Sequence, residues 1–141
     1  MGLFGKKQEK KVLFACIENA GRSQMAEGFF RKYAPKGWKA VSGGTQPKSY
    51  INPLAIQTMK EVGIDISNQK AKIISEDQIR TANIKVNMGC MDTTNCPSLV
   101  LGNYVDWKIE DPKDKPIEEV RKIRDQIEAK VKELVRELQH E

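Results

Sequence analysis

The pattern that decides the fold lies in residues 12–23, which read Val12-Leu13-Phe14-Ala15-Cys16-Ile17-Glu18-Asn19-Ala20-Gly21-Arg22-Ser23. The apolar run that we expect as a strand over residues 11–15 is typical of a strand covered on both faces. The short polar loop after it leads into a helix that we expect over residues 23–33. Strand, turn and helix in this order place Cys16 inside a ring of backbone N–H groups, which is a site for a tetrahedral oxyanion.

The residue types in this loop suit nucleophilic chemistry. The N–H groups and the helix dipole favour the thiolate form of Cys16, which is a competent nucleophile. Arg22 can hold two oxygens of a bound anion with its planar guanidinium. Ser23 can donate a hydrogen bond to the sulfur, and Asn19 can hold the turn with its side chain. The alternative is a buried core cysteine beside a solvated arginine, and the loop length and context favour the oxyanion site.

Composition limits the classes of protein to consider. The chain has 141 residues, of which 39% are hydrophobic and 30% charged, and this predicts a single domain with a real core. We expect residues 1–10 to be a basic leader that need not be ordered and residues 11–141 to form one catalytic domain. No stretch approaches the roughly 20 apolar residues of a membrane span, so we expect a cytoplasmic protein without a membrane partner.

The charge balance argues against a nucleic-acid partner. The net charge is +5, but basic residues alternate with acidic ones and aromatic residues are only 6% of the chain, which favours a solvated surface. We expect no nucleic-acid partner and a monomer. Three cysteines are not a disulfide framework in a reducing compartment. The absence of a close cysteine pair and the position of the single His140 in the tail argue against zinc.

The order of elements predicts an α/β fold. We expect strands over residues 11–15, 38–42, 84–88 and 104–107, and helices over residues 23–33, 53–62, 76–82 and 117–138. We place a turn at Gly43-Gly44 and the inner face of the second helix at Leu54, Ile56, Met59 and Val62. Alternating strands and helices imply a three-layer α/β/α architecture with a central four-stranded parallel sheet. Sites in such sheets form beyond the carboxyl ends of the strands, where Cys16, Cys90 and Asp111 fall.

Asp111 and the two other cysteines form a second group of candidates. Asp111, held by Pro112, can protonate a leaving oxygen or accept a proton, although Asp-Pro can also be a simple turn. Cys90 and Cys96 would lie about 9 Å apart along a rigid helix, and a disulfide needs Cα atoms within ~7 Å, so a bond between them requires the segment to loop or unwind. One thiol can then attack a Cys16 adduct and the other can carry the oxidation to the surface; two inert thiols are the alternative.

Taken together, these motifs resemble those of thioredoxin-coupled arsenate reductases, which belong to the low-molecular-weight protein tyrosine phosphatase superfamily. The resemblance covers nearly all of residues 11–138 and rests on Cys16 to Gly28, Asn52-Pro53, Ile64-Asp65-Ile66-Ser67, Cys90 with Cys96, and Asp111-Pro112. It implies the phosphatase-like fold, arsenate as substrate and thioredoxin as reductant. Because the electrons come from thiols, it implies no metal and no cofactor.

The resemblance also implies roles for individual residues. Cys16 would attack arsenate while Asp111 assists the loss of a hydroxyl. Cys90 would attack Cys16, release arsenite and leave a Cys16–Cys90 disulfide. Cys96 would then attack Cys90, and thioredoxin would reduce the Cys90–Cys96 disulfide. The oxyanion would be bound by the loop residues Ile17, Glu18, Asn19, Ala20, Gly21, Arg22 and Ser23.

The chain departs from the family at several positions. Glu18 stands where a Gly is usual and places an acid beside the anion unless it points outward. Ala20 and Gly21 replace a usual Ser and Cys, and the cysteine pair is one residue closer. Some relatives bind a potassium ion, and Asn19, Glu27 and Ser42 match that site. Lys72 stands where an Asp is expected, so we hypothesise that its ammonium group takes the place of the cation.

Two other functions use the same loop. A phosphatase acting on phosphotyrosine or a small phosphomonoester would use Cys16, Arg22 and Asp111 and release its adduct with water. Lys113-Asp114 argue against it, because such phosphatases commonly have aromatic residues there. The third possibility is an oxyanion-binding module without catalysis.

Overall fold

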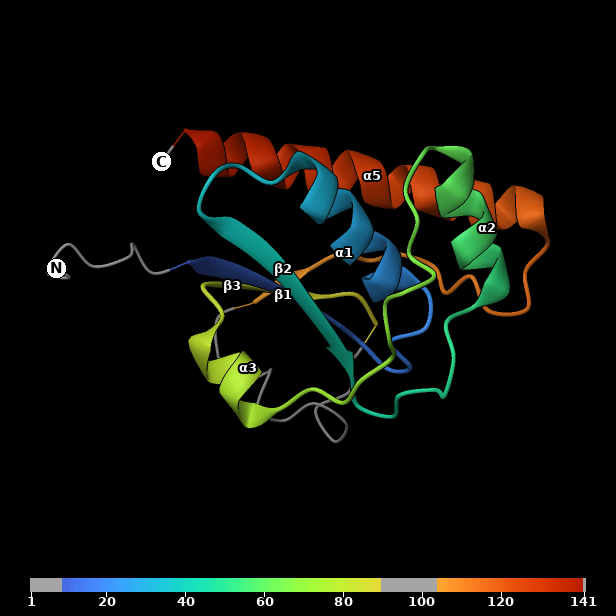
Figure 1. Cartoon of the computed structure of the whole chain (residues 1–141), viewed down its shortest axis with the longest axis horizontal. Coiled ribbons are helices and arrows are strands. Elements are labelled where there is room, and N and C mark those ends of the chain that lie inside the picture. The colour runs from blue at the N-terminus through green and yellow to red at the C-terminus, as the bar shows by residue number, and fades with distance from the viewer. Residues whose placement is uncertain (1–8, 90–103, 141) are drawn as a thin grey trace, which may run out of the picture.

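The computed structural model describes residues 9–89 and 104–140, which form a three-layer α/β/α arrangement (Figure 1). The central sheet contains β1 (Lys10–Cys16), β2 (Trp38–Gly44), β3 (Ile84–Asn87) and the short β4 (Val105–Asp106). The strands lie in the order β2-β1-β3-β4, and every neighbouring pair is parallel. This confirms the predicted four-stranded parallel sheet. Most of the predicted leader, as well as Cys90 and Cys96, lies outside the described residues.

Helices cover both faces of the sheet. The helices α1 (Arg22–Tyr33), α2 (Pro53–Glu61) and α5 (Ile117–Gln139) lie on one side, and α3 (Glu76–Thr81) lies on the other (Figure 1). The core lies between β1 and the longer helices, where the fully buried Phe14 packs edge-on against Phe30 at 6.0 Å between ring centroids. The predicted helix over 117–138 is present as α5, and it buries one apolar face made of Val120, Ile123, Ile127, Val131, Leu134, Val135 and Leu138.

Local sequence signals explain where the shorter helices begin. The side chain of Asn52 accepts a hydrogen bond from Leu54 N at 2.9 Å, and Pro53 fills the first turn, where its missing N–H costs nothing. Ser75 and Gln78 form a reciprocal capping box at the start of α3. The first residue of each helix is thereby set by polar side chains at its N-terminal end.

The predicted turn at Gly43-Gly44 is wrong, because both residues belong to β2. Gly44 pairs with Cys16 in the register of β1 and β2. A Cβ at Gly44 would collide with the carbonyl oxygen of Ile17. Gly44 therefore serves close approach to the loop after β1, and Gly43 serves close approach to Ile74; neither reverses the chain.

The predicted inner face of α2 is only partly correct. Met59 is fully buried as expected, but the other buried residues of the helix are Ala55 and Thr58. Leu54 and Ile56 are only partly buried. Small side chains at positions 55 and 58 let the helix approach its neighbours closely, and α2 contacts α5.

Arg124 on α5 ties this helix to α2. Its side chain is almost fully buried, and Nη1 donates to Thr58 O and to Glu61 Oε1, each at 2.9 Å. We expect Arg124→Met to lower the free energy of unfolding by about 1–3 kcal/mol, because the buried Thr58 carbonyl loses its charged donor. Chemical denaturation at neutral pH measures this loss.

Arg121→Met is the matched control for this prediction, because the Arg121 side chain also binds Glu61 but is much more exposed. Exposed ion pairs contribute little to the free energy of unfolding, so Arg121→Met should destabilise the protein much less than Arg124→Met. Equal destabilisation by both substitutions would contradict a special role for the buried guanidinium.

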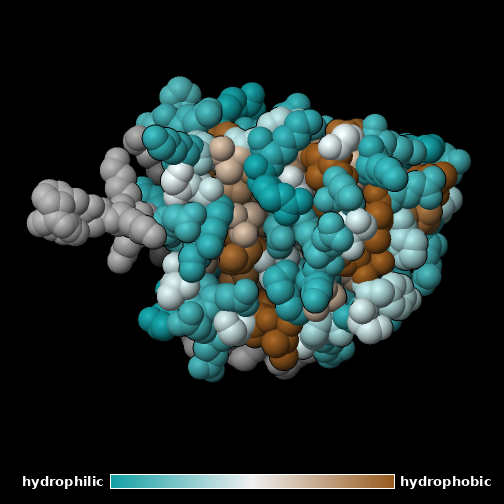
Figure 2. All heavy atoms as spheres, in the orientation of Figure 1, coloured by the Kyte–Doolittle hydropathy of each residue, from teal (hydrophilic) through white to brown (hydrophobic). Residues whose placement is uncertain are grey.

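The face seen in Figure 2 is mostly hydrophilic, with separate hydrophobic patches between polar side chains. Among the described residues, no helix is both long and apolar enough to cross a membrane.

Candidate active site

The Cys16 thiol lies at the carboxyl end of β1, where the chain turns towards α1. Its side chain is buried, and its Sγ accepts a hydrogen bond from the backbone N of Asn19 at 3.1 Å. The hydroxyl of Ser23 lies 2.8 Å from the same sulfur. Asn19 has a φ of 50°, a left-handed conformation that asparagine tolerates better than most residues. This turn directs the Asn19 N–H at the sulfur, as an anion-binding loop requires.

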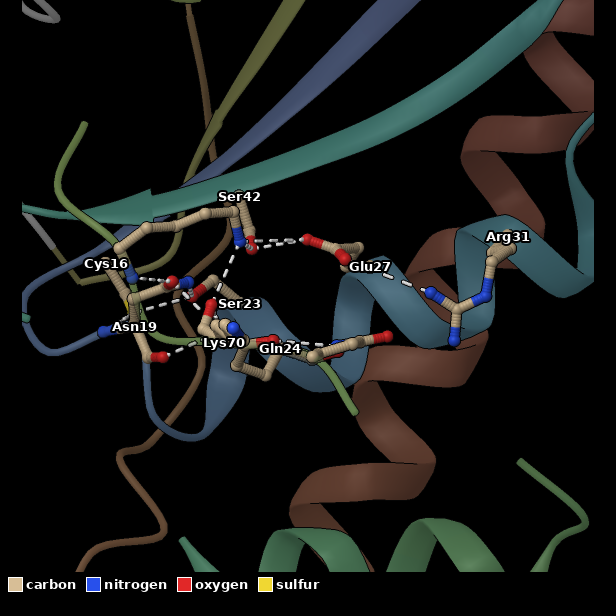
Figure 3. A network of polar contacts seen from close by, with 10 residues as sticks. Cys16, Asn19, Ser23, Gln24, Glu27, Arg31, Ser42 and Lys70 are labelled. Carbon is tan, nitrogen blue, oxygen red and sulfur yellow. Dashed lines mark hydrogen bonds and ion pairs between the residues drawn. The ribbon is translucent and has the colours of Figure 1, made fainter. Parts of the chain in front are cut away.

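A buried polar network fixes this arrangement (Figure 3). Asn19 Nδ2 donates to Ser23 Oγ at 2.7 Å, which leaves the hydroxyl hydrogen of Ser23 for the sulfur of Cys16. Gln24 Nε2 is 2.9 Å from each of three acceptors: Asn19 O, Asn19 Oδ1 and Lys70 O. Asn19, Ser23 and Gln24 are fully buried. Because solvent cannot replace these contacts, the network holds the donors to the sulfur in one orientation.

Ser23→Ala tests the donor to sulfur directly. We expect it to slow alkylation of Cys16 by iodoacetamide by about 10- to 150-fold at neutral pH, because a hydrogen bond to a charged group contributes about 1.5–3 kcal/mol. Mass spectrometry of the labelled Cys16 peptide measures the rate. Ser67→Ala, at an exposed position in the same chain, is the control and should leave the rate unchanged. An unchanged rate in Ser23→Ala would contradict a donor role.

Arg22 lies at the start of α1 and contacts the loop that carries Asp111. Its Nη1 donates to Ile109 O at 3.0 Å, and its Nη2 is 3.4 Å from Asp111 Oδ2. Gly89, just before Cys90, has a φ of 143°, and a Cβ there would stand 2.5 Å from Arg22 Nη1. The guanidinium therefore lies against a backbone that has room for it only because residue 89 is glycine.

Asp111 and Pro112 lie beside the anion loop. The Asp111 side chain is half exposed, and its Oδ1 accepts from Lys113 N at 3.0 Å. Pro112 is buried against the loop, since a Cβ on Gly21 would stand 2.9 Å from Pro112 Cγ. The carboxyl group is thus held near the anion loop while remaining open to solvent. Glu110 forms an ion pair with Lys115 at 3.0 Å instead.

Glu18 is paired with two lysines from other segments. Its Oε2 is 3.4 Å from Lys113 Nζ and 3.6 Å from Lys48 Nζ. The hydrogen bond and charge of Glu18 raise the pKa of Lys113. The acid in the loop is therefore compensated by positive charge from neighbouring segments.

Lys72 occupies the centre of the predicted cation set. Its Nζ donates to Ser42 Oγ at 3.1 Å and to Lys70 O at 3.1 Å, and it lies 3.6 Å from Glu27 Oε1. The backbone N of Lys72 donates to Asn19 Oδ1 at 2.9 Å. These residues do not fit a potassium ion, because the ammonium group of Lys72 already contacts the Ser42 and Glu27 oxygens and the backbone N–H of Lys72 occupies Asn19 Oδ1.

The structure thus brings together Cys16, Arg22, Asp111 and the loop residues of the sequence prediction. Cys90 and Cys96 lie outside the described residues, and Asn19, Glu27, Ser42 and Lys72 form a separate cluster linked to the loop through Asn19. Sequence reasoning missed Gln24, Lys48 and Gly89. Gly89, next to Cys90 and after a strand, was the only one of the three with a signal in the sequence. Gln24 lies within the run that carries the family resemblance but has no signal of its own there, and Lys48 stands out in no pattern.

Comparison with known proteins gives consistent matches. The family model described as low molecular weight phosphotyrosine protein phosphatase matches residues 11–141. A curated arsenate reductase from Staphylococcus aureus is 38% identical over 125 residues, which are 87% of this chain and 94% of that protein.

Among the solved structures that are similar over most of the chain, two illustrate the two activities found with this fold. One is a thioredoxin-dependent arsenate reductase from Corynebacterium glutamicum, with a TM-score of 0.78 and 34% identity over 94% of this chain and 63% of that one. The other is an arginine phosphatase from Geobacillus stearothermophilus, with a TM-score of 0.82 and 25% identity over 93% of this chain and 94% of that one.

Proposed function

Because this chain belongs to the low-molecular-weight phosphotyrosine protein phosphatase family, we propose that it is an enzyme that reduces arsenate to arsenite, with thioredoxin as its reductant. The observation that carries the proposal is the buried Cys16 thiol, which has donors from Asn19 and Ser23 on its sulfur. The similarity to the arsenate reductase of Staphylococcus aureus supports arsenate as the substrate, and the thioredoxin-dependent structure supports the reductant.

The first step forms a bond between sulfur and arsenic. The Cys16 thiolate attacks arsenate, while Arg22 and the backbone N–H groups of the loop bind the other oxygens. One hydroxyl of arsenate leaves as water with a proton from Asp111. The ion pair of Arg22 with Asp111, at 3.4 Å, supports a common position for both groups beside the anion. Arsenic is still pentavalent in this adduct.

The second stage moves two electrons. The Cys90 thiolate attacks the Cys16 sulfur, an S–S bond forms, and the S–As bond breaks with its electron pair going to arsenic, which leaves as trivalent arsenite. Cys96 then attacks Cys90 and frees Cys16, and the two thiols of thioredoxin reduce the Cys90–Cys96 disulfide. The sequence positions of Cys90 and Cys96, following β3 and Gly89, support this order. We also propose residues 11–141 as the catalytic domain and the reducing cytoplasm as its compartment.

Phosphatase activity is the second candidate function. The family match and the similarity to the arginine phosphatase favour it, because attack by Cys16 on a phosphomonoester would need the same loop. In that case water would release the enzyme adduct, and no second cysteine would take part.

One assay tests the proposal. With thioredoxin, thioredoxin reductase and NADPH present, arsenate should cause NADPH oxidation that stops when thioredoxin is omitted. Arsenite should form in equal amount to the NADPH consumed, because both are two-electron changes. Efficient hydrolysis of aryl phosphate without any arsenate-dependent oxidation would instead establish the phosphatase.

We further propose that the Lys72 ammonium group acts as a built-in cation. It reaches Asn19 indirectly: it donates to Lys70 O, which also accepts from Gln24 Nε2, and Gln24 Nε2 in turn donates to Asn19. The wild-type rate should then be constant when potassium replaces sodium at fixed ionic strength. Lys72→Met should lower kcat/KM roughly two- to ten-fold, because the lysine is partly exposed and its ion pair is screened. Lys70→Met is the control, since Lys70 uses only its backbone carbonyl in the cluster. A strong rise of the wild-type rate with potassium would contradict the proposal.

A further inference from the structure

A small hollow lies beside the anion loop. Its lining includes Glu18 and Gly21 of the anion loop, Lys48 and Tyr50 of the segment between β2 and α2, and Asp111 and Lys113, and its volume is about 190 Å³. Pockets that enclose drug-sized ligands usually measure about 300–1,000 Å³. A cavity of about 150 Å³ can bind benzene, however, so the volume of the hollow by itself admits an aryl group, and the side chains that cross it decide what enters.

The side chain of Glu18 joins three segments of the chain beside this hollow, because it contacts lysines from two other segments. Lys48 comes from the segment between β2 and α2, and Lys113 comes from the loop of Asp111. One carboxylate oxygen of Glu18 lies within 3.6 Å of both ammonium groups. The backbone N of Lys48 also donates to the backbone O of Glu18 at 3.0 Å. We call Glu18, Lys48 and Lys113 the rim clasp.

We infer that Glu18 is a specificity-determining residue, because the rim clasp holds two lysines across the path that the ester group of a bound phosphomonoester would take. An inorganic oxyanion has no such group and meets no obstacle. The inference rests on the proposed function and deepens it by naming the substrate class, which is small inorganic tetrahedral oxyanions in preference to aryl phosphomonoesters.

The rim clasp is expected to change binding selectivity by a moderate factor. The three side chains are 27–50% exposed, so each ion pair contributes little and is screened by salt. Loss of both pairs corresponds to a change of about two- to thirty-fold in binding selectivity. Raising the salt concentration should weaken the rim clasp of the wild type and shift its selectivity in the same direction.

The test measures selectivity rather than turnover. Inorganic phosphate and phenyl phosphate are the probes, and calorimetry gives the ratio of their dissociation constants for the full-length protein at low and high salt. Every protein in the series carries Cys16→Ala, so that phenyl phosphate is bound without being hydrolysed. Both probes are phosphate anions, so the ratio largely cancels the general effect of removing a carboxylate. Glu18→Gln keeps the bulk and removes the ion pairs, and Glu18→Gly removes both. Glu9→Gln is the matched control, because Glu9 pairs with Lys39 at 3.6 Å at the opposite end of β1.

The outcomes distinguish a failure of the rim clasp from a failure of the proposed arsenate reductase function. A shift of about two- to thirty-fold towards phenyl phosphate in Glu18→Gln, reduced at high salt and missing in Glu9→Gln, supports the rim clasp. An unchanged ratio in both Glu18 variants overturns it, even if the wild type reduces arsenate. Absence of arsenate reduction overturns the proposed function but leaves the ratio as a test of the rim clasp. Failure of both probes to bind at millimolar concentration overturns both.

Discussion

Cys90→Ser is expected to abolish arsenate-dependent NADPH oxidation, with the rate falling to the background. The Cys16 adduct would form, but no thiolate would be present to attack the Cys16 sulfur and release arsenite. Hydrolysis of para-nitrophenyl phosphate should persist, because that reaction needs only the anion loop, Arg22 and Asp111. The same variant thus separates the redox activity from the activity of the loop itself.

Cys96→Ser should differ from Cys90→Ser in a specific way. It should release about one arsenite per chain in a single burst and then stop with a Cys16–Cys90 disulfide, because no further thiol frees Cys16. Quenched-flow detection of arsenite and the mass of the non-reduced Cys16 peptide measure both parts. Cys16→Ser is the control that should remove every activity. If both single variants turned over arsenate like the wild type, the cysteine cascade would be wrong.

The strand–loop–helix unit could be predicted because its signals are local. An apolar run, a short loop and a helical period are enough to place Cys16 at the carboxyl end of a buried strand and Arg22 at the start of α1. The parallel sheet followed from the alternation of strands and helices, which has few alternatives in a chain of this length. The contact between Ser23 and Cys16 was also predictable, because both residues belong to this one unit.

Contacts between distant segments were harder to predict. The strand character of Gly43 and Gly44 depends on the backbone of Ile17 and on Ile74, neither of which is close in sequence. The pairing of Glu18 with Lys48 and Lys113 depends on how three loops are placed. Sequence alone showed an acid in an anion loop, and only the fold showed the two lysines that compensate it. The cluster around Lys72 was predictable only through the resemblance to a family with a cation there.

Arg22→Lys is expected to lower kcat/KM for arsenate by about 10²–10³-fold, the usual cost of losing a preorganised donor to developing negative charge. The guanidinium of Arg22 donates to Ile109 O and lies 3.4 Å from Asp111 Oδ2, so it already has a fixed plane before an anion arrives. A lysine ammonium is a point charge that cannot present two parallel donors to an anion from this position. The loss should therefore fall on kcat as well as on KM.

The control for this substitution is Arg31→Lys, on the same helix, where the side chain is exposed and lies 3.9 Å from Glu27. It should retain wild-type kinetics, and thermal unfolding should confirm that both variants are folded. A change confined to KM would mean that Arg22 binds substrate and transition state equally well. A loss below ten-fold would contradict the central role of its planar guanidinium, since charge alone would then explain how the loop stabilises its oxyanion.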